Sequence, residues 1–279
     1  MTARTSYAYG LLWLSKRGVN LDDDKSILDA CEGVPLHRTN MTLVSAKAWR
    51  MCHGKPHDAF TEPLKKCSAA RLAEREFQQC NEKQLKNWIC HSALLEKTRS
   101  IFKKMCVLDT KTFWKRDVFE EAQFGLVLSI ALRSCPRRDI AVVRRGVEDG
   151  NYFDEKNKTI VLNTHKTAKY YGAMKIRLNR PEWRIWIRLR AQAEMRGLYT
   201  HLLYNRNWSP MTRDGFASFL KRNIKKIKGC ADKNVGVSLL RCICITHALR
   251  GGMSLAKRRE LAATMGHNTN QQTQYRKIL

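Results

Sequence analysis

The amino-acid sequence predicts a mainly α-helical protein with a small antiparallel β-sheet, which is an α+β fold class. Most apolar residues recur at helical spacing, whereas two short stretches in the middle of the chain have the β-branched, alternating character of strands. The 279 residues, 43% of them hydrophobic, are sufficient for two domains with ordinary cores. We expect a helical domain over residues 1–88 and a second domain over residues 89–279.

The first ninety residues predict a small all-helical unit. Thr5–Lys16 is amphipathic and ends before Gly18, and Leu21–Asp24 resembles a helix N-cap region, with acidic residues at the positive end of the helix dipole. Glycine and proline residues separate two further helices, over Thr42–His53 and Leu64–Gln79. A fresh helical start after Gln84–Ile89 predicts a linker there.

The second domain is predicted to be built on one strongly apolar helix. After a helix over Leu94–Met105, the stretch Arg116–Arg133 is apolar along most of its length, which is typical of a central core helix. Pro136 then ends it. Lys158–Thr164 and Ala173–Leu178 are the predicted strands, and the basic turn between them makes them a hairpin.

Two basic helices follow the hairpin. Pro181–Arg196 has tryptophans at helical spacing, which favours core packing on one side and arginines on the other. Thr212–Lys228 places apolar residues inward and a row of cations outward. We expect four of these cations to contact a DNA backbone, which positions a protein without conferring sequence specificity: Lys221, Arg222, Lys225 and Lys226.

The charge of the chain indicates a polyanionic partner. There are 52 Lys and Arg against 25 Asp and Glu, a formal net charge of +27. Residues 1–90 carry 14 basic and 10 acidic side chains, and residues 91–279 carry 38 and 15. The partner we expect is double-stranded DNA, bound mainly by the second domain. The nearly balanced charge of the first domain favours a modest role in DNA binding or a contact with another protein.

Several other classes are excluded by pattern. No run of about 18 apolar residues and no signal-peptide core is present, so we expect neither membrane insertion nor secretion, and a cytoplasmic or nuclear protein. The ten cysteines contain no CxxC pair and suit neither a metal site nor a disulfide framework. No Walker loop or carboxylate triad indicates a nucleotide or metal cofactor, so none is expected.

The last forty residues combine an arginine, a histidine and a tyrosine. Arg241 lies near the start of a mostly apolar helical stretch, and a short helix over Ala256–Met265 is ended by Gly266. His267 follows at once, and Tyr275 comes eight residues later. A phenol has a pKa of about 10 and attacks a phosphodiester only where neighbours stabilise the developing charge. Arginine does this well, because its planar group holds two phosphate oxygens.

These residues resemble the second half of the catalytic motif of tyrosine recombinases and integrases, especially the divergent viral and mobile-element branch. The resemblance covers residues 90–279 and, in layout only, the first ninety. In that branch a proline turn precedes the first catalytic arginine, and Pro136-Arg137-Arg138-Asp139-Ile140 matches that pattern, so Arg137 takes the role. Arg133 and Arg138 are the alternatives, and Arg138 is otherwise expected to bind DNA.

The resemblance also implies a lysine on the hairpin as general acid. The stretch His165–Gly172 contains a Lys-Thr-x-Lys pattern similar to that of the family, which assigns the role to Lys166. Lys169 is the fallback, and otherwise contacts DNA. The alternative is a basic hairpin that touches phosphates without chemistry.

The activity implied is site-specific DNA recombination. Tyr275 attacks a phosphodiester and forms a 3′-phosphotyrosyl link, Arg137, Arg241 and His267 stabilise the transition state, and Lys166 protonates the leaving 5′ oxygen. No metal or cofactor is required. A type IB topoisomerase-like enzyme would use the same residues, and a non-catalytic DNA-binding relative is the third possibility.

Two features depart from the family pattern. The family has histidine or lysine three residues before its second arginine, where this chain has Ser238, which carries no charge. The spacing from His267 to Tyr275 is one residue shorter than is common, although Tyr275 is the only tyrosine after Tyr204. The chain ends four residues after Tyr275, so we expect an oligomer, dimer or tetramer, that forms on DNA rather than a stable free tetramer.

Overall fold

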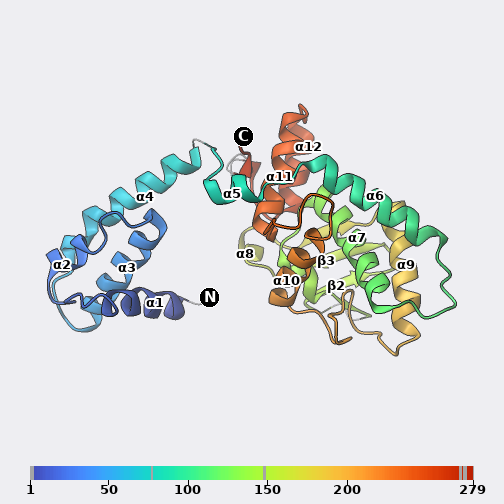
Figure 1. The fold of residues 1–279 in the computed structure, drawn as a ribbon, viewed down its shortest axis with the longest axis horizontal. Coiled ribbons are helices and arrows are strands. Elements are labelled where there is room, and N and C mark those ends of the chain that lie inside the picture. The colour runs from blue at the N-terminus through green and yellow to red at the C-terminus, as the bar shows by residue number, and fades with distance from the viewer. Residues whose placement is uncertain (1–2, 77, 147–148, 270–271, 273–274, 279) are drawn as a thin grey trace. The chain divides into compact units, whose positions relative to one another are not determined.

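In the computed structural model the chain divides into two units, Met1–Gln79 and Cys80–Leu279 (Figure 1). The structure describes residues 3–76, 78–146, 149–269, 272 and 275–278. The division lies after Gln79 rather than after the predicted linker, because the intervening helix α5 (Glu82–Asn87) is bonded to the second unit. Asn87 Oδ1 accepts a hydrogen bond from the backbone of Asn234 at 2.6 Å.

The first unit is all-helical, as predicted. Its elements are α1 (Ala3–Ser15), α2 (Asp24–Asp29), α3 (Leu36–Cys52), a 3₁₀ turn η1 (Asp58–Phe60) and α4 (Thr61–Glu76). Asp23 caps α2 through hydrogen bonds to two backbone N–H groups, which confirms the predicted N-cap region. The core is small, and its fully buried side chains are Leu14, Ile27, Ala46 and Phe60.

The second unit is mainly helical with one small sheet, which confirms the predicted fold class. Its remaining elements in chain order are α6 (His91–Val107), α7 (Arg116–Ser134), η2 (Arg138–Val142), β1 (Arg144–Arg145), β2 (Asn151–Asp154), β3 (Thr159–Leu162), α8 (Ala168–Tyr171), β4 (Met174–Arg177), α9 (Arg180–Glu194), α10 (Arg213–Ile224), α11 (Val237–Arg250) and α12 (Leu255–Thr264). Figure 1 shows α7 inside the unit, with helices on several sides.

The central helix α7 is the core element that the apolar pattern predicts. It is buried along almost its whole length and packs against α6, α9 and α11. Gly125 permits the closest approach, since a Cβ there would lie 2.5 Å from the Ile101 side chain of α6. α7 ends at Cys135, whose backbone is left-handed (φ 44°), and the chain then turns through Pro136.

The sheet has the order β1-β2-β3-β4 and extends the predicted hairpin by two strands. β3 pairs antiparallel with β2 and β4, with Val161 opposite both Tyr152 and Lys175. The two-residue strand β1 pairs parallel with β2, so the sheet is mixed rather than purely antiparallel. The connection between β3 and β4 contains α8, a four-residue helix, where a simple turn was predicted.

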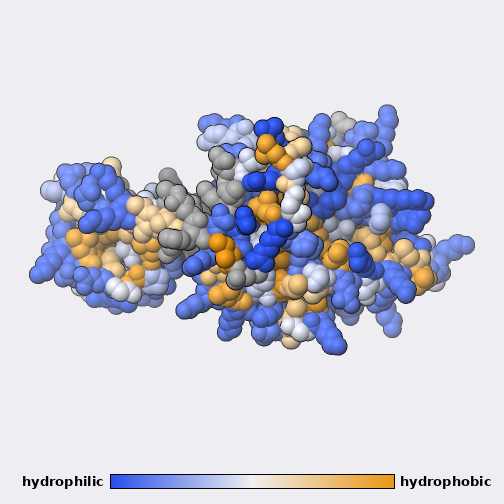
Figure 2. All heavy atoms as spheres, turned by 90° about the horizontal axis from the view of Figure 1, so that it is seen from above, coloured by the Kyte–Doolittle hydropathy of each residue, from blue (hydrophilic) through white to orange (hydrophobic). Residues whose placement is uncertain are grey.

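Hydrophilic residues predominate on the visible face of each unit, with hydrophobic residues in smaller groups between them (Figure 2). None of the helices in the described part of the chain has the length and apolar character needed to span a bilayer. The described residues also contain no cluster of three or more His, Cys, Asp or Glu that is arranged to hold a metal ion.

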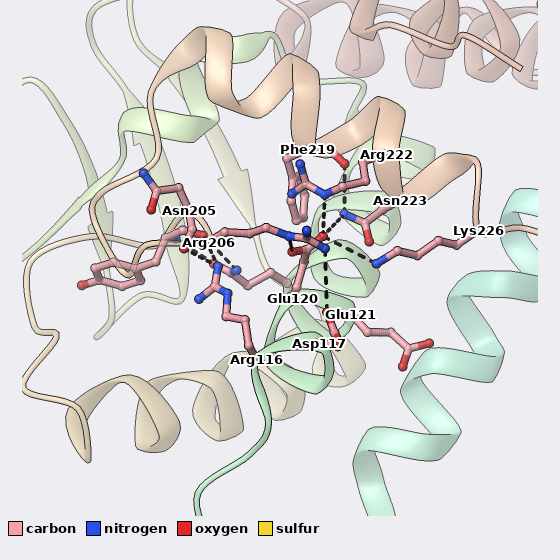
Figure 3. A network of polar contacts seen from close by, with 12 residues as sticks. Arg116, Asp117, Glu120, Glu121, Asn205, Arg206, Phe219, Arg222, Asn223 and Lys226 are labelled. Carbon is pink, nitrogen blue, oxygen red and sulfur yellow. Dashed lines mark hydrogen bonds and ion pairs between the residues drawn. The ribbon is translucent and has the colours of Figure 1, made fainter. Parts of the chain in front are cut away.

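A buried carboxylate holds α10 against α7. Glu120 of α7 is fully buried and accepts hydrogen bonds from Arg206 Nε at 2.9 Å and from Arg222 Nε at 3.0 Å (Figure 3). The Asn223 amide donates a third at 2.9 Å. Burial by itself raises the pKa of Glu120, but these hydrogen bonds outweigh it and lower the pKa to about 2.

We predict that Glu120→Ala destabilises the protein by about 1–3 kcal/mol, because it removes the acceptor shared by the buried Asn223 amide and the partly exposed Arg206 and Arg222. The measurement is urea unfolding followed by tryptophan fluorescence. Asp214→Ala is the matched control, since it removes a carboxylate from an ion pair with Arg138 in which the Asp214 side chain is 94% exposed. Equal unfolding midpoints for the two variants would contradict the structural role of Glu120.

Candidate active site

The second unit contains a cavity of about 750 Å³ whose wall is mostly polar and basic. Its lining residues come from five parts of the chain: Arg137, Arg138, Asp139, Thr164, His165, Lys166, Arg213, Ala217, Gly236, Val237, Ser238, Arg241 and Tyr275. Four of the five predicted catalytic residues are among them. The fifth, His267, contacts two of these four directly.

Arg241 is the most deeply buried charge of the site. It lies one turn into α11, with only 4% of its surface exposed, and its Nη2 donates to the Met265 carbonyl at 3.3 Å. The same nitrogen lies 3.3 Å from His267 Nδ1. Burial lowers the pKa of Arg241, and the charge of Arg137 contributes to the same effect. Arg241 Nε is also buried and has no partner within the described residues.

The hydrogen bond from Arg241 fixes the tautomer of His267. A guanidinium can only donate, so His267 Nδ1 is the acceptor and the proton of the neutral ring is on Nε2. Burial first, and then the charges of Arg241 and Arg137, lower the pKa of His267 to about 4. His267 is therefore neutral near pH 7 and carries a buried Nε2–H donor, which has no partner within the described residues.

Tyr275 lies against both of these groups. Its ring stacks on the His267 ring, with centroids 5.5 Å apart and planes at 17°. The Arg241 guanidinium lies 5.1 Å from the centre of the Tyr275 ring, a cation–π distance. Two residues later, the backbone N–H of Lys277 donates to Thr246 Oγ1 of α11 at 2.8 Å. The tyrosine is thus held on the helix that carries Arg241.

Gly266 joins the histidine to the lysine hairpin. It ends α12 as predicted, with φ +64°, and its carbonyl accepts a hydrogen bond from Thr167 Oγ1 at 2.8 Å. A Cβ at Gly266 would lie 2.7 Å from Met174 Sδ, so a larger residue would push the hairpin away. Lys166 is next to Thr167 and is exposed at the cavity wall. Lys169 is exposed on α8 and is not part of the cavity lining.

The three candidates for the first arginine have separate locations. Arg137 and Arg138 line the cavity, whereas Arg133 belongs to a different contact. Its Nη2 lies 2.9 Å from the buried Glu182 carboxylate and donates to the Arg177 carbonyl at 2.7 Å. Arg133 is therefore engaged in a structural ion pair outside the cavity lining, and its side chain is 42% exposed.

α10 ends at Ile224 rather than at the predicted Lys228, so Lys225 and Lys226 follow the helix. The four cations predicted to bind DNA here differ among themselves. Lys221 and Lys225 are exposed and form no ion pair within the part of the chain that the structure describes. The prediction that all of them face outward is wrong for Arg222, which turns toward Glu120, and Lys226 Nζ lies 3.6 Å from the same carboxylate. The buried carboxylate, which the helical pattern does not reveal, accounts for the difference.

Two charged residues that line the cavity, Asp139 and Arg213, are not predicted as site residues by the sequence. The sequence predicts Arg213 only as part of a basic helix, and Asp139 only as the acidic residue of the pattern that assigns the first arginine. Arg213 Nε donates to Asp139 Oδ1 at 2.8 Å across a separation of 74 residues. No local pattern indicates a contact of this kind.

Comparisons with known proteins give a likeness of fold. No protein-family model matches the sequence, and no curated protein matches it. Among solved structures, the chain is similar to an XerA recombinase, with 12% identity and a TM-score of 0.44 over 99% of this chain and 86% of the other. It is also similar to the Tn1549 transposon integrase in two DNA complexes.

The first of these integrase complexes contains transposon right end DNA, with 15% identity and a TM-score of 0.47. The second contains circular intermediate DNA, with 16% identity and a TM-score of 0.45. Each match covers 100% of this chain and 96% of the integrase chain. All three neighbours are recombinases or integrases by name. At these identities, the function of this chain has to be argued from its own cavity.

We predict that protonation of His267 opposes folding. The pKa of His267 is about 4 in the folded chain and about 6.5 unfolded, so the unfolded state binds the extra proton between these values. Stability therefore falls as pH decreases from about 6.5 to 4, by up to ~1.4 kcal/mol per pH unit for this residue. His91, whose pKa burial also lowers to about 4, adds a similar dependence.

The measurement is urea unfolding at several pH values for wild type, His267→Gln and His91→Gln. Each variant should lose its own share of the pH dependence and keep the other. If His267→Gln retains the full wild-type slope, His267 is not held neutral in the fold.

Proposed function

We propose that this chain is a tyrosine recombinase that cleaves and rejoins double-stranded DNA through a 3′-phosphotyrosyl intermediate. The observation that carries the proposal is the position of the Tyr275 ring, held against the Arg241 guanidinium and the His267 imidazole at a cavity also lined by Arg137 and Lys166. A nucleophile, cations and a donor thus surround one space, which can hold a phosphodiester.

The contacts support a division of labour. Arg137 and Arg241 face the cavity and can hold the non-bridging oxygens of a phosphate, whose charge increases as the tyrosine attacks. The neutral His267 supports this as a hydrogen-bond donor through Nε2 rather than as a base, because its Nδ1 is occupied by Arg241. The arginines remain charged throughout, so the site is cationic before the phosphate arrives.

In the proposed step, the Tyr275 oxygen forms a bond to phosphorus and the bond to the 5′ oxygen of the next nucleotide breaks. The phenolic proton leaves to water in the open cavity, and Lys166 gives a proton to the leaving oxygen. The reverse attack by a 5′ hydroxyl, from the same or another strand, restores the phosphodiester. The phosphotyrosyl link conserves the bond energy, so the exchange does not require nucleotide hydrolysis.

We predict that a nicked duplex traps this intermediate, because the short strand released by cleavage diffuses away and prevents rejoining. The wild-type chain should become covalently attached to DNA, and a denaturing gel measures the shift. Tyr275→Phe should form no adduct while it still binds the duplex. Arg241→Ala should lower the rate of adduct formation by about 10²–10³-fold, as expected for loss of one preorganised donor.

The same reaction on supercoiled DNA separates the alternatives. Relaxation without joining of two duplexes would favour a topoisomerase-like enzyme. DNA binding without an adduct in the wild-type chain would leave a non-catalytic DNA-binding protein. The assembly state on DNA, and an origin in a virus or mobile element, stay predictions from the sequence.

We further predict that Tyr275 acts in the site of its own chain. Its ring contacts Arg241, and Lys277 is bonded to Thr246 on the same helix. A mixture of Tyr275→Phe with Arg241→Ala should therefore remain as inactive as either variant alone. If the tyrosine were donated to a neighbouring molecule, mixing would rebuild complete sites and restore the adduct. Wild type diluted with Tyr275→Phe is the control for exchange between chains.

A further inference from the structure

Arg213 is the first residue of α10 and lines the same cavity as Arg137 and Arg241. Its Nε donates to Asp139 Oδ1 at 2.8 Å, and the other carboxylate oxygen lies 3.9 Å from Arg137 Nε. Asp139 is only 7% exposed. One buried carboxylate therefore lies between two guanidinium groups and holds both at the cavity wall.

A second ion pair, exposed to solvent and with its charges reversed, lies beside that of Arg213. Arg138 Nη1 donates to Asp214 Oδ1 at 2.9 Å. The first two residues of η2, Arg138 and Asp139, therefore pair with the first two residues of α10. Thr212 caps the helix by accepting from the Gly215 backbone N–H at 3.0 Å. These contacts hold the N-terminal turn of α10 at the edge of the cavity.

Asp139 occupies only one side of the Arg213 guanidinium. Within the described residues, Nε is its only engaged nitrogen, and the side chain is 48% exposed. The two terminal nitrogens, which carry four of the five N–H groups, remain available. Glu120 binds Arg222 on the same helix in a similar way, but there the carboxylate is deeply buried and the arginine does not line the cavity.

Ser238 shows why a further cation matters here. It lines the cavity at the start of α11, where the family has histidine or lysine, and its hydroxyl carries no charge. The N-cap of α11 is Gly236, which has no side chain to accept a hydrogen bond from the first N–H groups of the helix. Gly236 and Val237 also line the cavity. Arg213 lines the same cavity as Ser238 and brings to it a full positive charge that Ser238 lacks.

We propose that Arg213 is a third phosphate-binding arginine of the site, and that it supplies the cationic contact that Ser238 cannot. Its ligand is a DNA phosphodiester held in the cavity beside Tyr275, bound through the free edge of the guanidinium. This inference rests on the proposed function for its role in cleavage, but the phosphate contact itself does not require cleavage.

The test is the salt dependence of DNA binding. All proteins carry Tyr275→Phe, so that no covalent step interferes, and the anisotropy of a fluorescent duplex gives the association constant at a series of salt concentrations. The slope of log K against log salt is negative, and each lost phosphate contact decreases its magnitude by about 0.9. Arg213→Ala should show this decrease. Arg184→Ala, which removes an exposed arginine of α9 outside the cavity, should not.

Asp139→Asn distinguishes binding from positioning. If Arg213 only held Asp139 in place, Arg213→Ala and Asp139→Asn would weaken DNA binding alike and leave the slope unchanged. In our proposal Asp139→Asn keeps both arginines and their slope, whereas Arg213→Ala decreases it. An unchanged slope in Arg213→Ala, or binding that does not depend on salt in any of the proteins, overturns the proposal.

A second measurement, made with Tyr275 present, separates this inference from the proposed function. Formation of the covalent adduct on the nicked duplex should be about 10²-fold slower in Arg213→Ala and partly restored in Arg213→Lys. If wild type forms no adduct while Arg213→Ala still decreases the slope, the recombinase assignment fails and the phosphate site remains. If the slope is unchanged while wild type forms the adduct, Arg213 has no such role and the recombinase assignment remains.

Discussion

The burial of the Arg241 charge is the constraint on which the site depends. A guanidinium removed from water loses several kcal/mol of solvation, which the fold has to offset with hydrogen bonds or an opposite charge. Around Arg241 the described residues provide a backbone carbonyl, the His267 ring and the face of Tyr275, but no carboxylate in an ion pair. The charge is therefore incompletely satisfied, and a phosphate in the cavity would complete it. A site of this kind favours anions at the expense of stability in their absence.

The same constraint links segments far apart in the chain. Arg241 fixes the tautomer of His267, and the turn at Gly266 that presents this histidine is bonded to Thr167 beside Lys166. The hairpin, the end of α12 and the middle of α11 thus form one hydrogen-bonded unit around the cavity. Displacement of any one of them would move the groups that the other two present. A side chain at Gly266, for which the turn has no space, would cause such a displacement.

Local patterns in the sequence were sufficient for most of the helices, for two of the strands and for the glycine that ends α12. The apolar stretch of α7, the strands β3 and β4, and the glycine stop at Gly266 are all set by residues close in sequence. The strands β1 and β2 are not predicted because they are short and are stabilised by pairing, β2 with β3 and β1 with β2, rather than by their own composition. The bond between Arg213 and Asp139, and that between Arg222 and Glu120, join residues 74 and 102 positions apart, which no local pattern shows.

Two carboxylates decide which cations of this basic chain are available to a ligand. Glu120 is enclosed by Arg206, Arg222 and Asn223, so it neutralises the charge of Arg222 and joins α10 to α7. Asp139 is also buried, but it lies at the cavity wall, and it engages Arg213 through Nε alone. Both carboxylates accept from the Nε of an α10 arginine and orient it, so the feature that distinguishes Arg213 from Arg222 is its place in the cavity lining. The net charge therefore overstates the cationic surface, and the location of the few acidic residues determines where an anion can bind.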